Sequence, residues 1–381
     1  MIKYFILITL FFFSCTKHIN VKSKDFNLYI NGYNNAYIIK KNNKKYTLKK
    51  NLIIPKNKVL IIENGVIINV KKGANITNNG TLLIGLNIKS DSIYSYKDDN
   101  LINKKIYYNT KIYSKNKFKI NSDLNSEIYI NGCFIKNVII NSFNININNS
   151  IFLFSNLIFN NSKIKINNSL FKRNNFIITN VDFDFNDSFF LNNKNFLIKN
   201  CKNSIINNCL FIKNKKIEII NSNNFNLLNN IFYKNINGFT INSNKGYFKI
   251  FNNLFINNNT VINNKDTVQI FLINNTFDKN ELVLKSHLTI NKKNIISKNN
   301  IFSNNKNLFN VKNTLINNSY CLSNTDSLKG YYNIYTNPLY IDSDKFNYLL
   351  NKDSKAFKSG NNNNNLGANI YYINNIKYLN K

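Results

Sequence analysis

The chain has 381 residues, of which 43% are hydrophobic, so it can bury a continuous core and is not a disordered polypeptide. It carries 51 Lys and Arg against 18 Asp and Glu, a formal net charge of +33, and Arg173 is its only Arg. Such a charge favours a polyanionic partner, although Lys lacks the planar guanidinium group that binds phosphates bidentately. The alternative is compositional, because Asn, Lys, Ile, Phe and Tyr share A/T-rich codons.

The first residues, MIKYFILITLFFFSC, have the pattern of an export signal. Lys3 precedes an apolar run from Tyr4 to Phe13, which is too short to span a bilayer. A small residue directly before Cys15 resembles the lipobox of bacterial lipoproteins, which implies that Cys15 is lipidated. We therefore predict a signal peptide over 1–15 and a polar tether over 16–25. The alternatives are a secreted protein cleaved elsewhere and an uncleaved anchor.

From this export signal we expect a protein of the cell envelope, a membrane-anchored lipoprotein of the outer membrane or cell surface. It also argues against DNA or RNA as a partner. Residues 26–50 are expected to add strands that cap the first coil of the repeat region that follows.

Variants of one short motif then recur along the chain, as in INNSLFKRNN, NDSFFLNN, NNCLFIKN and INNTFDKN. Aligned on their aromatic residue, the segments repeat every 18–25 residues. The aromatic column is Phe134, Phe152, Phe171, Phe190, Phe211, Phe232, Phe255, Phe277, Phe302 and Tyr320. Apolar residues five and seven positions earlier, such as Ile166 and Ile164, alternate with polar ones, which indicates a strand with one buried face.

Asn stands on both sides of the aromatic column. Three positions before the aromatic residue the chain has Asn131, Asn149, Asn168, Asp187, Asn208, Asn229, Asn252, Asn274, Asn299 and Asn317, and Asn is also frequent three positions after it. Asn suits tight bends because it tolerates the left-handed backbone region. A period near 21 residues with short strands is typical of a solenoid. Stacked coils would place equivalent residues about 4.8 Å apart, so the Asn column before the aromatic residue would form an amide ladder.

The spacing of the cysteines indicates neither a metal site nor a set of disulfides. Cys15, Cys133, Cys201, Cys209 and Cys321 are odd in number and widely spaced, without metal-binding pairs or a disulfide framework. We interpret the last four as small buried residues, and we predict no metal ion and no cofactor.

Together, the Asn columns, the aromatic column and the coil length resemble the right-handed parallel β-helix of pectate lyase-like proteins. LIIPKNKVLIIENGVIINVKKGANITNNGTLLIGL (52–86) resembles the first coils of bacterial surface β-helix proteins, and residues 337–370 resemble their terminating segment. The resemblance implies an all-β, single-stranded right-handed parallel β-helix over 51–336 and a terminating segment over 337–381.

Enzymes of this group use outward-facing carboxylates or a basic residue, and the lyases often bind Ca²⁺. The candidates here are Asp182 and Asp184, two apart on one predicted strand, with Lys165 one coil earlier and Arg173 at a turn. Cross-coil ion pairs on an exposed sheet would explain the same residues without catalysis. No Ser, Cys or His arrangement supports a nucleophilic triad.

We therefore predict an exported, lipid-anchored β-helix protein that is non-catalytic and serves as a structural or glycan-binding surface module. An acidic polysaccharide is its expected partner. The alternative is a polysaccharide lyase or glycoside hydrolase acting on acidic polysaccharide, in which case Ca²⁺ becomes a possible cofactor.

Overall fold

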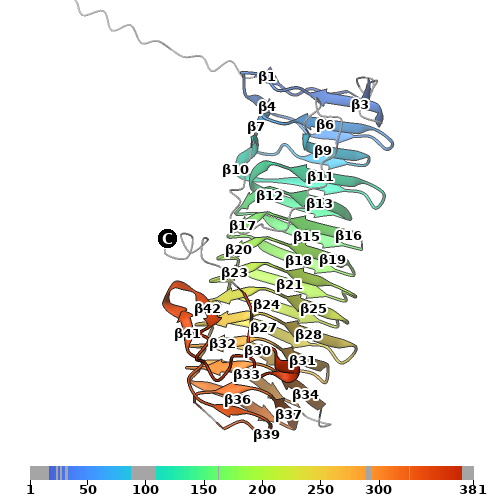
Figure 1. Ribbon diagram of the computed structural model, residues 1–381. Coiled ribbons are helices and arrows are strands. Elements are labelled where there is room, and N and C mark those ends of the chain that lie inside the picture. Colours follow the sequence, from blue (N-terminus) through green and yellow to red (C-terminus); the bar gives the residue numbers. More distant parts are fainter. Residues whose placement is uncertain are drawn as a thin grey trace, which may run out of the picture.

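The computed structural model describes residues 17–22, 25, 28–30, 33–86, 109–161, 163–288, 293–325 and 327–370. It is a right-handed parallel β-helix, in which the chain winds into a long rod of stacked coils (Figure 1). The predicted fold is confirmed. Cys15 and the predicted signal peptide lie outside the described residues. Within the described ranges, no helix has the length and apolar character needed to cross a bilayer.

Each complete coil has three strands, as in β16 (Lys163–Asn167), β17 (Leu170–Lys172) and β18 (Asn175–Thr179). Each of these strands pairs in parallel with its equivalent in the next coil: β19 (Asp182–Asn186), β20 (Phe189–Leu191) and β21 (Asn195–Lys199). The rod therefore has three faces, which we call the 15-stranded sheet, the short-strand face and the long-strand face; the last two are joined as one 25-stranded sheet.

The remaining strands follow the same order. The 15-stranded sheet also contains β2 (Leu28–Ile30), β3 (Tyr33–Ile39), β6 (Val59–Glu63), β9 (Thr81–Leu86), β11 (Glu127–Asn131), β13 (Asn144–Asn148), β22 (Ile205–Asn207), β25 (Phe225–Leu228), β28 (Tyr247–Phe251), β31 (Gln269–Ile273), β34 (Lys293–Lys298), β37 (Thr314–Ser319) and β39 (Gly330–Tyr331). The short-strand face also contains β4 (Tyr46–Leu48), β7 (Ile67–Val70), β14 (Ile151–Leu153), β23 (Leu210–Ile212), β26 (Ile231–Tyr233), β29 (Leu254–Ile256), β32 (Thr276–Asp278), β35 (Ile301–Ser303), β38 (Leu322–Ser323) and β40 (Ile334–Tyr335), with β1 (Lys17–His18) paired to β4.

The long-strand face also contains β5 (Leu52–Ile54), β8 (Ile76–Asn78), β15 (Asn156–Asn160), β24 (Ile217–Ile220), β27 (Asn237–Asn242), β30 (Thr260–Asn264), β33 (Leu282–His287) and β36 (Asn307–Lys312). Two longer strands, β10 (Thr110–Ser122) and β12 (Cys133–Ser142), run across both the short-strand and the long-strand face.

Residues in the left-handed region turn the chain at its corners. The corner after the 15-stranded sheet is made by Asn149, Asn168, Asp187, Asn208, Asn229, Asn252, Asn274 and Asn299, all with φ between 43° and 55°. Asn lowers the cost of this conformation relative to other residues with a Cβ. Side-chain hydrogen bonds connect neighbouring coils along this corner. Asn168 Nδ2 donates to Asn149 Oδ1 at 2.6 Å, and Asn252 Nδ2 donates to Asn229 Oδ1 at 2.7 Å.

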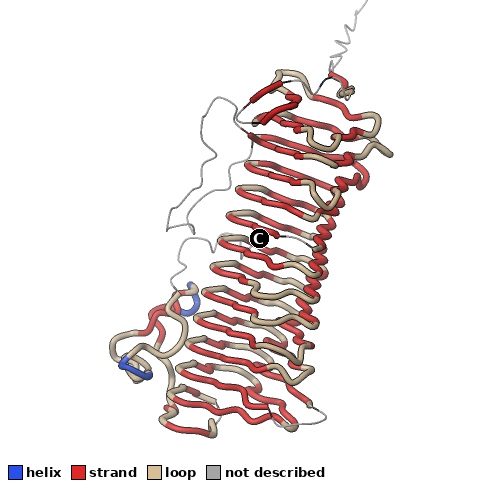
Figure 2. Tube along the Cα trace, turned by 90° about the vertical axis from the view of Figure 1, so that its right-hand side faces the viewer, coloured by secondary structure: helices blue, strands red, loops and turns tan. Residues whose placement is uncertain are grey.

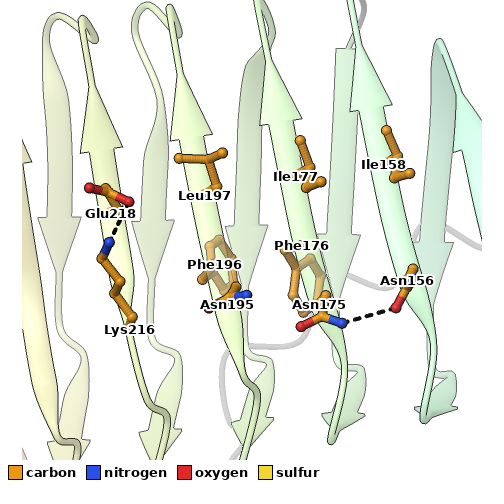
Figure 3. A pocket seen from close by; sticks show the side chains of 10 residues that line it. All are labelled: Asn156, Ile158, Asn175, Phe176, Ile177, Asn195, Phe196, Leu197, Lys216 and Glu218. Carbon is orange, nitrogen blue, oxygen red and sulfur yellow. Dashed lines mark hydrogen bonds and ion pairs between the residues drawn. The ribbon is translucent and has the colours of Figure 1, made fainter.

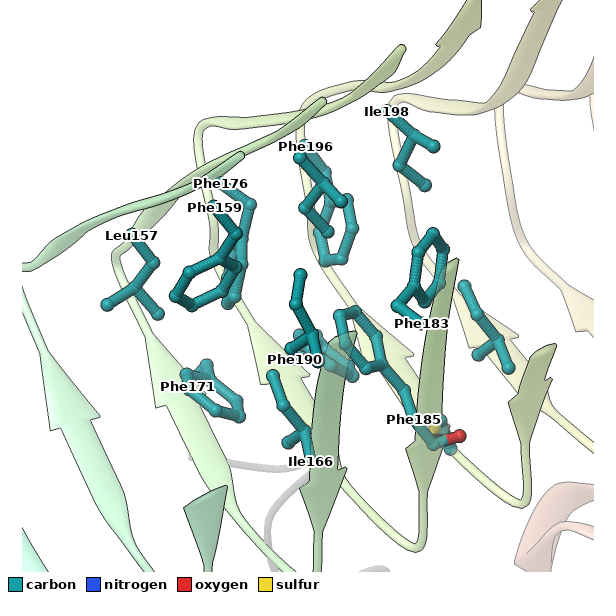
Figure 4. Packing of buried hydrophobic residues seen from close by; sticks show 14 of the residues in the cluster. Leu157, Phe159, Ile166, Phe171, Phe176, Phe183, Phe185, Phe190, Phe196 and Ile198 are labelled. Carbon is teal, nitrogen blue, oxygen red and sulfur yellow. Dashed lines mark hydrogen bonds between the residues drawn. The ribbon is translucent and has the colours of Figure 1, made fainter. Parts of the chain in front are cut away.

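The aromatic column fills the centre of the rod. Phe152, Phe171, Phe190, Phe211, Phe232, Phe255, Phe277 and Phe302 are fully buried, and their rings stack at centroid distances of 4.7–5.3 Å. Phe183 and Phe185 from β19 and Phe176 and Phe196 from the long strands pack beside this stack (Figure 4). Burying one large aromatic side chain per coil makes this stack a main source of stability.

A fully buried Asn ladder follows the column three positions after the aromatic residue. Its members Asn174, Asn193, Asn214, Asn235, Asn258, Asn280 and Asn305 are at most 3% exposed. Asn235 Nδ2 donates to Asn258 Oδ1 and to the Phe211 carbonyl, both at 3.0 Å, while its own Oδ1 accepts from Asn214. Amide ladders between coils were predicted for the column before the aromatic residue, where such bonds are present, but the more complete ladder is this one after the aromatic residue.

A second buried column lies one residue after the first corner. In the earlier coils it contains Ser150, Ser169, Ser188 and Cys209, and in the later coils Asn230, Asn253, Asn275 and Asn300. Ser169 donates through its hydroxyl to the Asn167 carbonyl, whereas Asn253 Nδ2 donates to Asn275 Oδ1 at 3.1 Å. Both side chains bond across coils, since Ser169 Oγ also accepts from the Ser150 backbone at 3.2 Å, but only the longer Asn side chain adds a bond between side chains of neighbouring coils.

The sequence alignment is out of register at both ends of the repeat region. Asn131 pairs with Asn148, so that Gly132 takes the corner position, although Asn131 Oδ1 still accepts from Asn149. Asn317 lies exposed in β37 opposite Ile296, and Tyr320 takes the corner with φ 51°. The last predicted ladder residue is therefore wrong. In the coil from β37 to β38, Ser323 lies opposite Phe302 and so occupies the aromatic column. The assignment of Tyr320 to that column is therefore wrong.

The C-terminal segment folds back onto the outside of the rod. The antiparallel pair β41 (Tyr340–Asp342) and β42 (Asn347–Leu350) and the 3-10 turns Ser343–Lys345 and Asn361–Asn363 lie beside the last coils (Figure 2). Tyr348 donates from its hydroxyl to Asp278 Oδ2 at 2.8 Å, and Ser303 donates to Asp278 Oδ1 at 2.8 Å. Burial, together with the charge of Asp278, raises the pKa of the Tyr348 hydroxyl, which stays protonated as a donor.

Candidate functional site: an outward groove on the long-strand face

The predicted carboxylate pair lies on the outer surface of the 15-stranded sheet. Asp182 and Asp184 on β19 are register partners of Lys163 and Lys165 on β16, as the alternation predicted. Asp184 Oδ1 accepts from Asn186 Nδ2 at 2.7 Å, and Asp182 Oδ1 accepts from the Lys202 backbone at 3.2 Å. Both carboxylates are thus held by neighbouring polar groups of the sheet surface.

Arg173 lies elsewhere. It occupies the corner between β17 and β18 with φ 60°, and its guanidinium group lies 5.4 Å from the ring centroid of Phe154 in the preceding coil. Lys136 Nζ lies 5.6 Å from the same ring. The structure therefore brings Lys165 beside Asp184 but places Arg173 at a different corner, in a cation–π cluster.

A groove of about 430 Å³ lies on the outside of the long-strand face, across β15, β18, β21 and β24. Along one side stand Asn156, Asn175 and Asn195, and Asn175 Nδ2 donates to Asn156 Oδ1 at 3.0 Å (Figure 3). Asn175 Oδ1 is buried and has no hydrogen-bond partner. The side therefore presents stacked carboxamides, which both donate and accept hydrogen bonds.

An aliphatic strip forms the middle of the groove. Ile158, Ile177 and Leu197 occupy one outward column of neighbouring coils, where the strand alternation would place polar residues. Ile177 is 38% exposed. This strip offers an apolar surface to a ligand and lies directly beside the carboxamides.

Basic residues frame the same groove. Lys216 pairs with Glu218 at 2.7 Å at one end, and Lys117 Nζ donates to Asn156 Oδ1 at 3.2 Å at the other. Lys199 follows Leu197 at the next outward position of β21. Because an exposed ion pair contributes little to stability, Lys216 can exchange Glu218 for an anionic ligand at small cost.

The described cysteines are buried and unpaired with one another: Cys133, Cys201, Cys209 and Cys321. Burial raises the pKa of the Cys201 thiol to about 11 and raises those of the other three thiols as well. Within the described ranges, no three His, Cys, Asp or Glu residues gather as metal ligands.

Sequence reasoning missed the groove, although the strands that build it carry a signal. NLIFN, NFIIT and NFLIK occur in three successive coils, each with Asn first and an aliphatic residue third. The third position faces outward in all three. An apolar residue repeated at an outward position is a recognisable sign of a surface that binds something.

No protein-family model matches the sequence, and no curated protein matches it. The structure is similar to a crystal structure of the periplasmic alginate epimerase AlgG, with a TM-score of 0.39 and 10% identity over 79% of this chain and 78% of that chain. A point mutant of AlgG gives a TM-score of 0.40 and 11% identity over the same shares. Likenesses of this size carry no information about the chemistry of this chain.

Proposed function

We propose that this protein is an exported, lipid-anchored module of the cell envelope that binds an acidic glycan along the groove of the long-strand face, without cleaving it. The observation that carries the proposal is the groove itself. It combines a row of carboxamides, a parallel aliphatic strip and lysines at its ends and flank.

These three features match the chemistry of an acidic sugar polymer. Carboxamides exchange hydrogen bonds with hydroxyl groups, aliphatic side chains cover the C–H faces of the sugar rings, and Lys ammonium groups attract carboxylates. The groove crosses four coils in a straight line, so successive sugar units of an extended polymer meet similar side chains.

The non-catalytic half of the proposal is supported by the surroundings of the carboxylates. Asp184 is engaged by Asn186, its register neighbour in the next coil is Ile205, and Arg173 belongs to another corner. A lyase or hydrolase needs a base and an acid that converge on one substrate bond. Cleavage of a polyuronate that is lost on changing Asp182, Asp184 or Lys165 would overturn this half.

Binding is tested with the intact chain, using polygalacturonate and alginate as acidic glycans and a neutral glucan for comparison. We expect Ile177→Asp to abolish binding of the acidic glycans, because it places a like charge in the middle of the groove. Ile296→Asp is the matched control: Ile296 is 36% exposed, against 38% for Ile177, but lies on the 15-stranded sheet.

Salt dependence adds a second readout. Affinity should fall as ionic strength rises, and Lys216→Gln should flatten that slope. Equal binding by both Asp variants, or no binding of any acidic glycan, would reject the groove as the site.

The anchor is tested separately. We propose that Cys15 carries the lipid, which would set the N-terminal end of the rod nearest the membrane, since β1 pairs with β4 in the first coils. Incorporation of labelled palmitate into the wild-type chain but not into Cys15→Ser would support this, and equal incorporation would contradict it.

A further inference from the structure

The corner between the short-strand face and the long-strand face differs in composition from the other two corners of the rod. The corner after the 15-stranded sheet is made by the Asn and Asp residues given above, and the corner after the long strands has positive φ at Asn161, Asn180, Asn200 and Asn221. At the remaining corner cations with positive φ recur between asparagines. We call them the basic corner; its members are Arg173, Lys213, Lys234 and Lys279.

Backbone conformation does not explain the basic corner. The left-handed region is strained for residues with a Cβ, and Asn adopts it more readily than Lys or Arg. Asn192, Asn257 and Asn304 have positive φ at the same corner in other coils, so Asn fits there. A codon bias toward A and T favours Asn as much as Lys and would not separate one corner from the others. We therefore infer that the cations are present for their side chains.

The basic corner presents its charges to solvent, since all four residues are exposed. The guanidinium group of Arg173 lies over the Phe154 ring, and Lys234 Nζ lies 5.0 Å from the ring centroid of Tyr233. Among the residues that the structure describes, no carboxylate forms an ion pair with Arg173, Lys213 or Lys234. These three charges are available to an anion from outside the rod.

One position of the basic corner holds a carboxylate of the chain itself. Asp344, in the 3-10 turn Ser343–Lys345 of the C-terminal segment, places its Oδ1 3.4 Å from Lys279 Nζ. The Asp344 side chain is 89% exposed, so charge and not burial brings the two groups together. This contact shows that a carboxylate outside the rod can reach the basic corner.

The basic corner borders the groove on its carboxamide side. Arg173 precedes Asn175 by two residues, and Lys213 precedes Lys216 by three. From the corner along β18, the outward residues are a cation, a carboxamide and an aliphatic residue: Arg173, Asn175 and Ile177. A glycan chain whose rings lie on the aliphatic strip therefore has one edge toward the basic corner.

The basic corner also extends beyond the groove. Arg173 and Lys213 belong to coils that line the groove, whereas Lys234 and Lys279 follow β26 and β32 in later coils. The successive pairings from β17 to β32 span about 24 Å at about 4.8 Å per coil. A polymer held in the groove can therefore continue along the same corner.

We propose that the basic corner makes the groove selective for acidic glycans. Arg173 and Lys213 bind carboxylates of the chain that lies in the groove, and Lys234 extends this contact toward Lys279. The orientation of the polymer follows, with its carboxylate edge toward the corner and its C–H faces on the aliphatic strip. This inference rests on the proposed function, since it requires that the groove binds the glycan.

The test compares polygalacturonate with its methyl ester, which has the same backbone without the charge, using the intact chain. The corner variant, Arg173→Asn with Lys213→Asn, has at both positions the residue found at Asn192. We expect it to bind polygalacturonate roughly tenfold more weakly, because it loses two exposed ion pairs that are each weak alone. Its binding of the methyl ester should match that of the wild type.

A charge-matched control is Lys202→Asn with Lys249→Asn. Both lysines are exposed; Lys202 lies in the turn before β22, and Lys249 lies on β28 of the 15-stranded sheet. This variant has the same net charge as the corner variant and should bind both polymers as the wild type does. Circular dichroism confirms that each variant is folded.

Equal binding of polygalacturonate by the corner variant and the control would overturn the inference. So would an equal loss of the methyl ester by the corner variant, since the corner would then support the groove without contacting carboxylates. Failure of the proposed function gives a different result: the wild type would bind neither polymer, or Ile177→Asp would bind polygalacturonate as the wild type does.

Discussion

Asn stands on both sides of the aromatic stack, and the two columns differ in what the side chain does. Before the aromatic, Asn208 has φ 52°, and its side chain lies at the partly buried corner and donates to Asp187. After the aromatic, Asn235 is 1% exposed, has no positive φ, and joins the coils on both sides of its own. The first column is selected for backbone conformation and the second for its hydrogen-bonding side chain.

This difference decides which substitutions each column tolerates. Gly matches or exceeds Asn at a left-handed corner, because it has no Cβ to clash with the following carbonyl. Gly has no amide, however, so it leaves buried donors and acceptors unpaired where Asn forms the ladder. The same replacement should therefore separate the two columns.

The largest effect is expected at Asn235. Asn235→Leu removes the acceptor of the Asn214 amides and a donor to the Phe211 carbonyl, which costs roughly 2–6 kcal/mol of unfolding free energy. Asn235→Gly should be equally damaging. Chemical denaturation followed by circular dichroism measures both, with Asn259→Leu as the control, since Asn259 is exposed in the next coil. A tolerated Asn235→Gly would contradict the assignment.

A smaller effect is expected at the corner. Asn208→Leu forces a residue with a branched side chain into the left-handed region at a cost of about 1–2 kcal/mol. Asn208→Gly should restore nearly all the stability of the wild type in the same denaturation assay. If the Gly variant were as unstable as the Leu variant, the bond to Asp187 and not the backbone would be the main contribution of this residue.

The smallest effect is expected at Cys209, between Ser188 and Asn230 in the second buried column. Cys209→Ser should change the unfolding free energy by no more than about 1 kcal/mol, because Ser188 makes the equivalent bond to a carbonyl two residues earlier.

The thiols provide an independent check of the same burial. Folding raises their pKa values, so it favours the neutral thiol and keeps the thiolate population low until the pH approaches the raised value. At pH 8 we expect Cys201 and Cys209 to react with a thiol reagent only after denaturant is added. Rapid reaction in the native protein would show that these two thiols are not buried.

The repeat was predictable from sequence because stacked coils place similar residues at equivalent positions. Phe171 meets Phe190 in the next coil, and Ile166 meets Ile147 in the preceding coil and Phe185 in the next, so apolar residues recur at fixed offsets, and this requirement is visible without coordinates. The register failed where the repeat loses its aromatic: Ile135 and Ser323 occupy the aromatic column at its two ends. Phe134 and Tyr320 are aromatic residues close to these positions in the sequence, and their assignment to the aromatic column was wrong.

The sequence by itself determined the winding, the coil length and the buried aromatic column, because these depend on periodic contacts between near neighbours in the repeat. Only the tertiary structure decided which Asn column is buried, since burial depends on how the three faces close around the core. It also decided that Ile158, Ile177 and Leu197 form one outward strip, that Arg173 stands apart from Asp184, and that the C-terminal segment returns along the short-strand face. Each of these depends on contacts between residues in different coils or faces, whose distance in space no single repeat encodes.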